Sequence, residues 1–174
     1  MSISSYRYSG DRTVLSYEEM NGYCNRAIKL NPNCKLTLIL MQVNDIEDYM
    51  KNEGSGFVQD LLQSVQDTVR RHVGHRGIVC PLQPNLMSVV VQDINSDIKL
   101  RAFIESLRSR IAWNYRLVDP KYEISFSFGV ACYPENGMDM RIVHRKLVKA
   151  LQMAQEKHTN CYVIYKEHLH GELS

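Results

Sequence analysis

The sequence has little of what would hold a protein in a membrane or on nucleic acid. Its longest apolar stretch, Leu36–Val43, is far too short to span a bilayer. Residues 1–11 lack the apolar core of a signal peptide. The 21 basic and 19 acidic residues nearly cancel, and a net charge of +2 favours neither nucleic acid nor a membrane surface as partner. We therefore expect a cytoplasmic protein with no direct membrane insertion and no nucleic-acid partner.

The sequence also lacks paired cysteines. The five cysteines are odd in number and scattered, with no Cys-x-x-Cys pair, which argues against a disulfide framework and against a structural zinc site. His72 and His75 lie near Cys80, yet no fourth ligand is evident. We interpret both histidines as solvent-facing residues at a helix end, and the cysteines as reduced, partly buried thiols.

What the chain does contain is the composition of one ordinary globular domain. It has 174 residues, of which 44% are apolar and 23% are charged. It is therefore long enough to bury a substantial core, and its composition is not that of a disordered chain. We divide it into a flexible lead-in over residues 1–13, a folded domain over residues 14–167 and a tail over residues 168–174.

Apolar residues recur with the period of a helix or a strand along most of the chain. The run Leu36–Val43 is apolar except for one Thr and one Gln, which is typical of a central strand buried on both faces. Phe57, Leu61 and Val65 begin a four-residue repeat typical of an amphipathic helix. Helices are predicted over residues 16–30, 55–73, 97–111 and 140–155, and strands over residues 36–43, 77–82, 86–92, 122–132 and 161–165.

The order of these elements indicates the fold class. Strand, helix, hairpin, helix and strand follow one another, with the hairpin turn at Gln83-Pro84-Asn85. This is the βαββαβ order of a ferredoxin-like α+β fold. An added C-terminal helix and strand extend it. We expect an antiparallel-dominated sheet flanked by helices.

Two charged clusters have simple interpretations. The acidic residues Asp45, Glu47 and Asp48 follow the first strand and are interpreted as a solvated helix start rather than a cation site. Arg108 and Arg110 stand near Trp113, a combination that can serve stacking on nucleic acid. We interpret this second cluster as a helix end with Trp113 packed against the sheet.

Residues 125–137 carry a family resemblance. They read Ser-Phe-Ser-Phe-Gly-Val-Ala-Cys-Tyr-Pro-Glu-Asn-Gly and resemble the strand and turn S-x-G-V-A-x-Y-P-x-D-G of GGDEF domains. The resemblance extends over residues 16–166, with supporting matches at Gly54, Ala150, Leu151, Ala154 and Asn160. GGDEF domains are bacterial diguanylate cyclases. The resemblance implies a nucleotide-cyclase palm and magnesium-dependent joining of two GTP molecules held on two facing domains.

The same resemblance places the family's metal-binding positions on residues without carboxylates. The first metal aspartate aligns with Gln42, and the signature aligns with residues 83–87, so that Asn85 and Leu86 occupy its acidic positions. Magnesium is a hard ion that prefers carboxylate oxygens. Pro84 removes an amide donor where paired glycines let the backbone approach phosphate. We expect Gln42, Asn85 and Leu86 to be vestigial positions, with no catalytic residue, metal site or cofactor.

Other inherited contacts are missing too. The guanine-reading positions align with Met50 and Gln59, and the phosphate-contacting lysine aligns with Gln155. The product-inhibition motif R-x-x-D would occupy residues 74–77, where only a displaced Arg76 survives. These losses together argue against nucleotide binding by the family's contacts.

The resemblance and the losses lead to three hypotheses. The first is a catalytically inactive GGDEF-like domain, not an enzyme, that acts as a protein-interaction, dimerisation or regulatory module in bacterial signalling or secretion. Its partner would be a second copy or another protein. The alternative is a non-catalytic sensor that binds GTP or cyclic di-GMP through new contacts from Arg76, Asp60 or Lys51. The third is a weak nucleotide hydrolase that uses Glu47 and Asp48.

Overall fold

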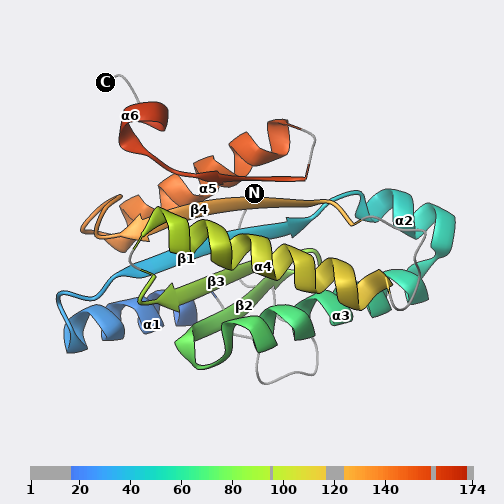
Figure 1. Cartoon of the computed structure of the whole chain (residues 1–174), viewed down its shortest axis with the longest axis horizontal. Coiled ribbons are helices and arrows are strands. Elements are labelled where there is room, and N and C mark those ends of the chain that lie inside the picture. Colours follow the sequence, from blue (N-terminus) through green and yellow to red (C-terminus); the bar gives the residue numbers. More distant parts are fainter. Residues whose placement is uncertain (1–16, 95, 117–123, 158–159, 172–174) are drawn as a thin grey trace.

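The computed structural model describes residues 17–94, 96–116, 124–157 and 160–171. Within these residues the strands form one five-stranded sheet in the order β2-β3-β1-β4-β5 (Figure 1). Neighbouring strands are antiparallel except β4 and β5, which are parallel. The strands are β1 (Leu36–Val43), β2 (Gly77–Gln83), β3 (Leu86–Gln92), β4 (Phe126–Tyr133) and β5 (Cys161–Ile164).

Helices cover both faces of this sheet (Figure 1). They are α1 (Tyr17–Leu30), α2 (Ile46–Glu53), α3 (Ser55–Val73), α4 (Asp97–Arg116), α5 (Met140–Glu156) and α6 (Glu167–His170), with a 3-10 turn at Gly74–Arg76. α3 and α4 pack on one face, and α1 and α5 pack on the other. Of the helices in the described residues, none is both long and apolar enough to cross a membrane.

Strand β1 lies in the middle of the sheet and contributes to two cores. Ile39 and Met41 belong to the core beneath α3 and α4, whereas Leu38 and Leu40 belong to the core beneath α1 and α5. Successive side chains of a strand point to opposite faces, so a strand covered on both sides is mostly apolar, and Thr37 and Gln42 are the two polar residues of β1. Gln42 is the one half-buried residue of the strand. The prediction of a central strand is confirmed.

The predicted α+β fold is confirmed, including its hairpin and its added C-terminal helix and strand. The predicted bounds of β1 and α3 are those observed. α4 continues to Arg116, beyond its predicted end at residue 111. The start of the predicted strand at residue 122 lies outside the described residues, and β4 is observed from Phe126. The acidic stretch after β1 does begin a helix, α2.

Two predictions about single side chains are wrong. His72 is buried, not solvent-facing, and its Nε2 lies 3.1 Å from the carbonyl oxygen of Phe103. It lies one turn after Thr68 on the face of α3 that meets α4. Trp113 is 66% exposed instead of packed against the sheet. Leu107 and Ile111 face the core, and Trp113 lies two residues further along α4 on the outer side.

The cysteines are free thiols, as expected. Cys24, Cys34 and Cys80 are buried, and Cys132 and Cys161 are half-buried. Burial raises the pKa of Cys24 to about 12 and the pKa of Cys132 to about 11. Both thiols therefore stay protonated at neutral pH, which suits small core residues and not nucleophiles.

The contact between α5 and β4 leaves no room for a side chain at Gly129. A Cβ atom there would lie 2.3 Å from the backbone nitrogen of Leu151 and 2.9 Å from the backbone oxygen of Leu147. Backbone atoms of a packed helix cannot move aside unless the whole helix shifts. Gly129, the glycine of the motif S-x-G-V-A, therefore lets α5 rest directly on β4.

We predict that Gly129→Ala lowers the free energy of unfolding by about 1–3 kcal/mol, because the added methyl group overpacks the α5–β4 contact. Gly56→Ala is the matched control, since no atom lies within 4 Å of the position of its Cβ. Removing this helical glycine should raise the free energy of unfolding by about 0.5 kcal/mol. Urea denaturation of both variants measures the difference. Equal effects would contradict the packing argument.

A second prediction concerns pH. Burial lowers the pKa of His144, on α5, from 6.5 to about 4. Between these values the unfolded chain binds a proton that the folded protein does not bind. The contribution of neutral His144 to the free energy of unfolding is therefore fully present above pH 6.5 and is lost as the pH falls toward 4. His144→Gln should reduce the slope of unfolding midpoint against pH in this window, whereas His75→Gln, at an exposed position, should keep it. An unchanged slope in His144→Gln would contradict the prediction.

Candidate functional site

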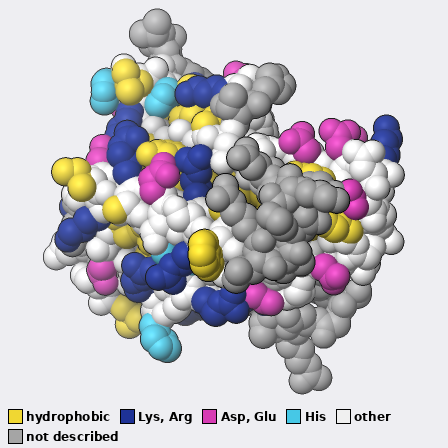
Figure 2. Space-filling view, turned by 45° about the vertical axis from the view of Figure 1, so that its right-hand side comes forward, with side chains coloured by type: hydrophobic (Ala, Val, Ile, Leu, Met, Phe, Trp, Pro, Cys, Tyr) yellow, Lys and Arg dark blue, Asp and Glu magenta, His cyan; other side chains and the backbone are white. Residues whose placement is uncertain are grey.

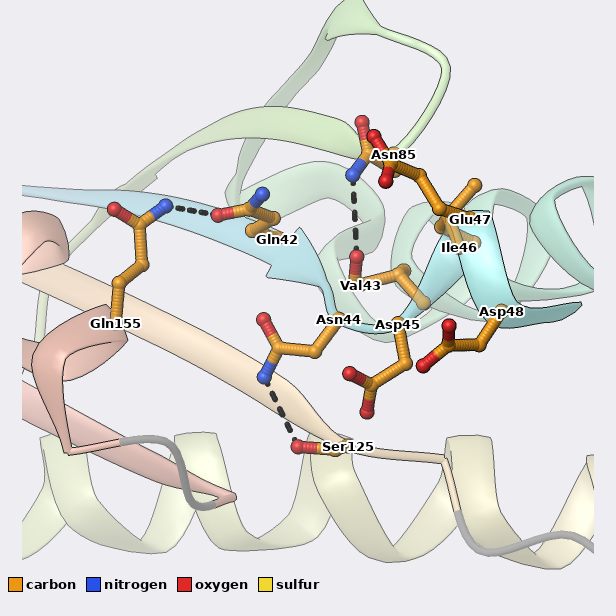
Figure 3. Close-up of a pocket in the computed structure, with 10 residues that line it drawn as sticks. All are labelled: Gln42, Val43, Asn44, Asp45, Ile46, Glu47, Asp48, Asn85, Ser125 and Gln155. Atoms are coloured by element: carbon orange, nitrogen blue, oxygen red, sulfur yellow. Dashed lines mark hydrogen bonds between the residues drawn. The ribbon is translucent and has the colours of Figure 1, made fainter.

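A pocket of about 470 Å³ opens where β1 ends (Figure 3). It is enclosed by the end of β1, the start of α2, the β2–β3 hairpin, the residue before β4 and the end of α5. Its lining is mostly polar and consists of Gln42, Val43, Asn44, Asp45, Ile46, Glu47, Asp48, Asn85, Ser125 and Gln155. Predicted site residues from distant parts of the sequence therefore meet here.

The register of the sheet decides which of the predicted positions reach the pocket. Gln42 pairs with Leu86 on β3 and with Ser127 on β4. Gln42 and Asn85 line the pocket. Leu86 is 2% exposed and packs in the core beneath α1 and α5. The third predicted position thus presents an apolar side chain to the core and no oxygen to the pocket.

Gln42 and Gln155 are hydrogen-bonded to each other across the pocket (Figure 3). The Nε2 group of Gln155, near the end of α5, donates to Oε1 of Gln42, near the end of β1. Both side chains are neutral amides. The pair joins a helix and a strand that are 113 residues apart in the sequence. It leaves no formal charge at this corner of the pocket.

The hairpin loop is fastened to the end of β1 by Asn85. The backbone nitrogen of Val43 donates to the carbonyl oxygen of Asn85 at 2.9 Å. In return, Nδ2 of Asn85 donates to the carbonyl oxygen of Val43 at 3.2 Å (Figure 3). The side chain of Asn85 and the carbonyl group of Val43 are therefore already engaged with each other.

Asn44 joins β1 to β4 and was not singled out from the sequence. Its Nδ2 donates to the hydroxyl oxygens of Ser125 at 2.9 Å and Ser127 at 3.1 Å. Its backbone nitrogen donates to the carbonyl oxygen of Ser125 at 2.9 Å. Two sequence signals could have indicated this contact. Ser125 and Ser127 alternate along the chain, and Asn44 stands two residues after Gln42.

Carboxylates gather at the rim of the pocket. Asp45 stands in the left-handed region with φ of +64°, which aspartate tolerates better than most residues, and α2 begins directly after it. Asp45, Glu47 and Asp48 are exposed. The lining contains no Lys or Arg in the described part of the chain. The pocket is therefore negative at its rim and neutral inside. Nor do the described residues contain a group of three or more His, Cys, Asp or Glu that could hold a metal ion.

The remaining predicted residues lie outside this pocket. Gln59 and Asp60 are exposed on α3, and Lys51 is exposed on α2. Met50 is 44% exposed, also on α2. Arg76 is engaged elsewhere: its Nη2 donates to the carbonyl oxygen of His72 at 2.6 Å, and its guanidinium lies 5.0 Å from the centre of the Phe103 ring.

The sheet order, the helices on both faces and the pocket at the end of β1 define a nucleotide-cyclase palm. A family model described as "Diguanylate cyclase, GGDEF domain" matches residues 17–161. The chain belongs to the GGDEF domain family, whose signalling molecule is cyclic di-GMP.

Solved structures of the same family have the same fold. The GGDEF domain of DgcB from Caulobacter crescentus, in complex with c-di-GMP, superposes with a TM-score of 0.71 at 12% identity, over 91% of this chain and 98% of that one. The active GGEEF domain of a diguanylate cyclase from Vibrio cholerae gives 0.71 at 16%, over 83% and 90%. A protein of Synechocystis sp. is 17% identical over 142 residues, and this chain spans about 20% of its length.

We predict that Asn44→Ala lowers the free energy of unfolding by about 1–3 kcal/mol, because it leaves partly buried hydroxyl groups without their donor. Asn52→Ala, at an exposed position in α2, is the matched control and should change it by less than about 0.5 kcal/mol. Chemical denaturation of the two variants gives the comparison. If Asn44→Ala lowers the free energy of unfolding by no more than Asn52→Ala does, the hydrogen bonds of Asn44 do not stabilise the fold.

Proposed function

We propose that this chain is a catalytically inactive GGDEF domain that acts through protein contacts, as a dimerisation or regulatory module in cyclic di-GMP signalling. The observation that carries the proposal is the hydrogen bond between Gln42 and Gln155. By the family resemblance, these positions belong to a metal-binding aspartate and a phosphate-binding lysine. A neutral amide pair stands where the chemistry needs a carboxylate and a cation.

The residues at the inherited metal positions do not fit magnesium. Oε1 of Gln42 accepts a hydrogen bond from Gln155, and the carbonyl oxygen of Val43 accepts one from Asn85. Leu86 offers no ligand atom and is buried in the core. Magnesium loses its water reluctantly and is usually held by one or two carboxylates together with phosphate oxygens. The exposed carboxylates at the rim belong to a different segment, Asp45 and the first turn of α2.

The pocket is also unsuited to a triphosphate. Its lining combines Asp45, Glu47 and Asp48 with neutral groups and includes no Lys or Arg among the described residues. Negative side chains repel an anionic ligand, and the repulsion is strongest where water is partly excluded. Pro84, in the hairpin loop, has no backbone N–H to donate to phosphate. The carboxylates at the rim would repel a nucleotide, and no described cation in the lining would offset that repulsion.

The inherited inhibitory motif for cyclic di-GMP lacks its aspartate, and the structure leaves no room for a side chain at that position. The aspartate of that motif would stand at Gly77, where a Cβ atom would lie 1.7 Å from the carbonyl oxygen of Val90. Glycine at this position therefore fits β2 against β3, and no side chain does. Arg76, the surviving basic residue, is bonded to His72 and stacked on Phe103.

One observation favours the alternative, a non-catalytic nucleotide sensor. The pocket at the end of β1 persists with a volume of about 470 Å³ and with amide and hydroxyl groups in its wall. Such groups can recognise a nucleobase without a metal ion. The DgcB domain that shares this fold was solved with c-di-GMP.

The test is an assay of GTP turnover with magnesium, in which both cyclic di-GMP and hydrolysis products are measured. We predict no product above background, because no metal ion is held against the triphosphate. The active GGEEF domain from Vibrio cholerae serves as the positive control. Product that disappears in Gln42→Ala would contradict the proposal and place an active centre at this pocket.

Calorimetric titration with GTP plus magnesium, and separately with cyclic di-GMP, distinguishes the nucleotide sensor from the module that acts through protein contacts alone. Absence of heat with both ligands agrees with the main proposal. Saturable heat without turnover would replace it with the sensor, and a loss of that heat in Asn44→Ala would place the ligand in the pocket.

A further inference from the structure

A second cavity, larger than the first, lies on the outer side of α5. This α5–α6 groove has a volume of about 700 Å³ and runs between α5 and the segment that leads from β5 into α6. Four cations from α5 line it: Arg141, Arg145, Lys146 and Lys149. Its apolar surface comes from Ile142, Val148 and Tyr165. Among the described residues the one carboxylate in its lining is Glu167.

Among the described residues, the lining of the groove has more cations than carboxylates. Lys146 is paired with Glu167, and Nη2 of Arg141 lies 2.8 Å from Oδ2 of Asp139. Arg145 is exposed and forms no ion pair with a described carboxylate. Lys149 donates to the carbonyl oxygen of His170 at 2.9 Å. The groove therefore combines an apolar surface with cationic side chains, which suits an acidic segment that also carries an apolar residue.

The same chain carries such a segment at its other end. α2 has no buried residue, and the exposed carboxylates Asp45, Glu47 and Asp48 lie at its start. Met50 follows them and is 44% exposed. In Figure 2 Asp and Glu side chains gather toward the end of the molecule where Figure 1 places α2, and most Lys and Arg side chains in view lie toward the other end.

We propose that the α5–α6 groove receives α2 of a second copy of this chain. The two surfaces have opposite charge and lie at opposite ends of one molecule, so α2 cannot reach the groove of its own chain. Complementary charges steer the encounter and fix the orientation. Burial of Met50 against Ile142 and Val148 adds an apolar contact. The inference rests on the proposed function, because it names the partner in its protein contacts.

The contact has a consequence for the pocket at the end of β1. Glu47 and Asp48 belong both to α2 and to the rim of that pocket. A second copy bound to α2 would therefore cover part of the pocket's mouth. This fits a GGDEF domain in which the former nucleotide face has become a protein-binding face.

Sedimentation velocity at low and at high salt tests the assignment. We expect association of the wild-type protein at low salt that weakens at high salt, because the Debye length falls from about 30 Å at 0.01 M to about 3 Å at 1 M. Arg145→Glu and Glu47→Lys should each weaken association by about tenfold, since each reversal replaces attraction with repulsion. Lys99→Glu, an exposed reversal on α4 outside the groove, should leave it unchanged.

Sedimentation velocity of an equimolar mixture of the two charge-reversal variants is the decisive experiment. The intact α2 of Arg145→Glu can enter the intact groove of Glu47→Lys, so the mixture should form a mixed complex about tenfold tighter than the self-association of either variant alone. Thermal melting checks that both variants fold. A wild-type monomer at low salt, salt-independent association, or a mixture without the complex would each overturn the inference. None of these results depends on GTP turnover, so the inactivity of the domain is judged separately.

Discussion

The contact of α5 with β4 at Gly129 decides what stands at the end of β1. Because Gly129 has no side chain, the backbone of α5 at Leu151 approaches the strand directly. Gln155 follows Leu151 by one helical turn, and Ser127 precedes Gly129 by two residues on the same face. Gln42 pairs with Ser127, so the close contact brings Gln155 over Gln42. The amide pair is a consequence of how the helix is seated.

The rest of the pocket follows from the same central strand. β1 pairs with β3 and β4, which brings the hairpin loop to one side of its end and the serines at the start of β4, Ser125 and Ser127, to the other. Asn85 and Asn44 then fasten both sides with hydrogen bonds between neutral groups. The chain keeps the fold of a nucleotide-cyclase palm, whereas the polar side chains of the proposed vestigial site form hydrogen bonds within the chain.

Sequence periodicity predicts the elements of this fold better than their partners. The apolar run of β1 and the four-residue repeat of α3 are local signals, and the structure confirms both. Periodicity gives the face of a helix but not what covers that face, which is why the burial of His72 and the exposure of Trp113 were predicted wrongly. Gln42 and Gln155 were placed in one site through the family resemblance. Their hydrogen bond depends on tertiary packing, which no local pattern contains.

Under the proposed function, the inherited metal position no longer holds a metal–nucleotide complex. Manganese, which replaces magnesium in oxygen sites and broadens nearby NMR signals, tests it most directly. The side-chain amide signals of Gln42, Asn85 and Gln155 would be followed as manganese and GTP are added together. We expect these signals to keep the same relative intensity as the signal of Asn52, at an exposed position on α2. Selective, GTP-dependent loss of the pocket signals would show a bound metal–nucleotide complex and contradict the proposed inactivity.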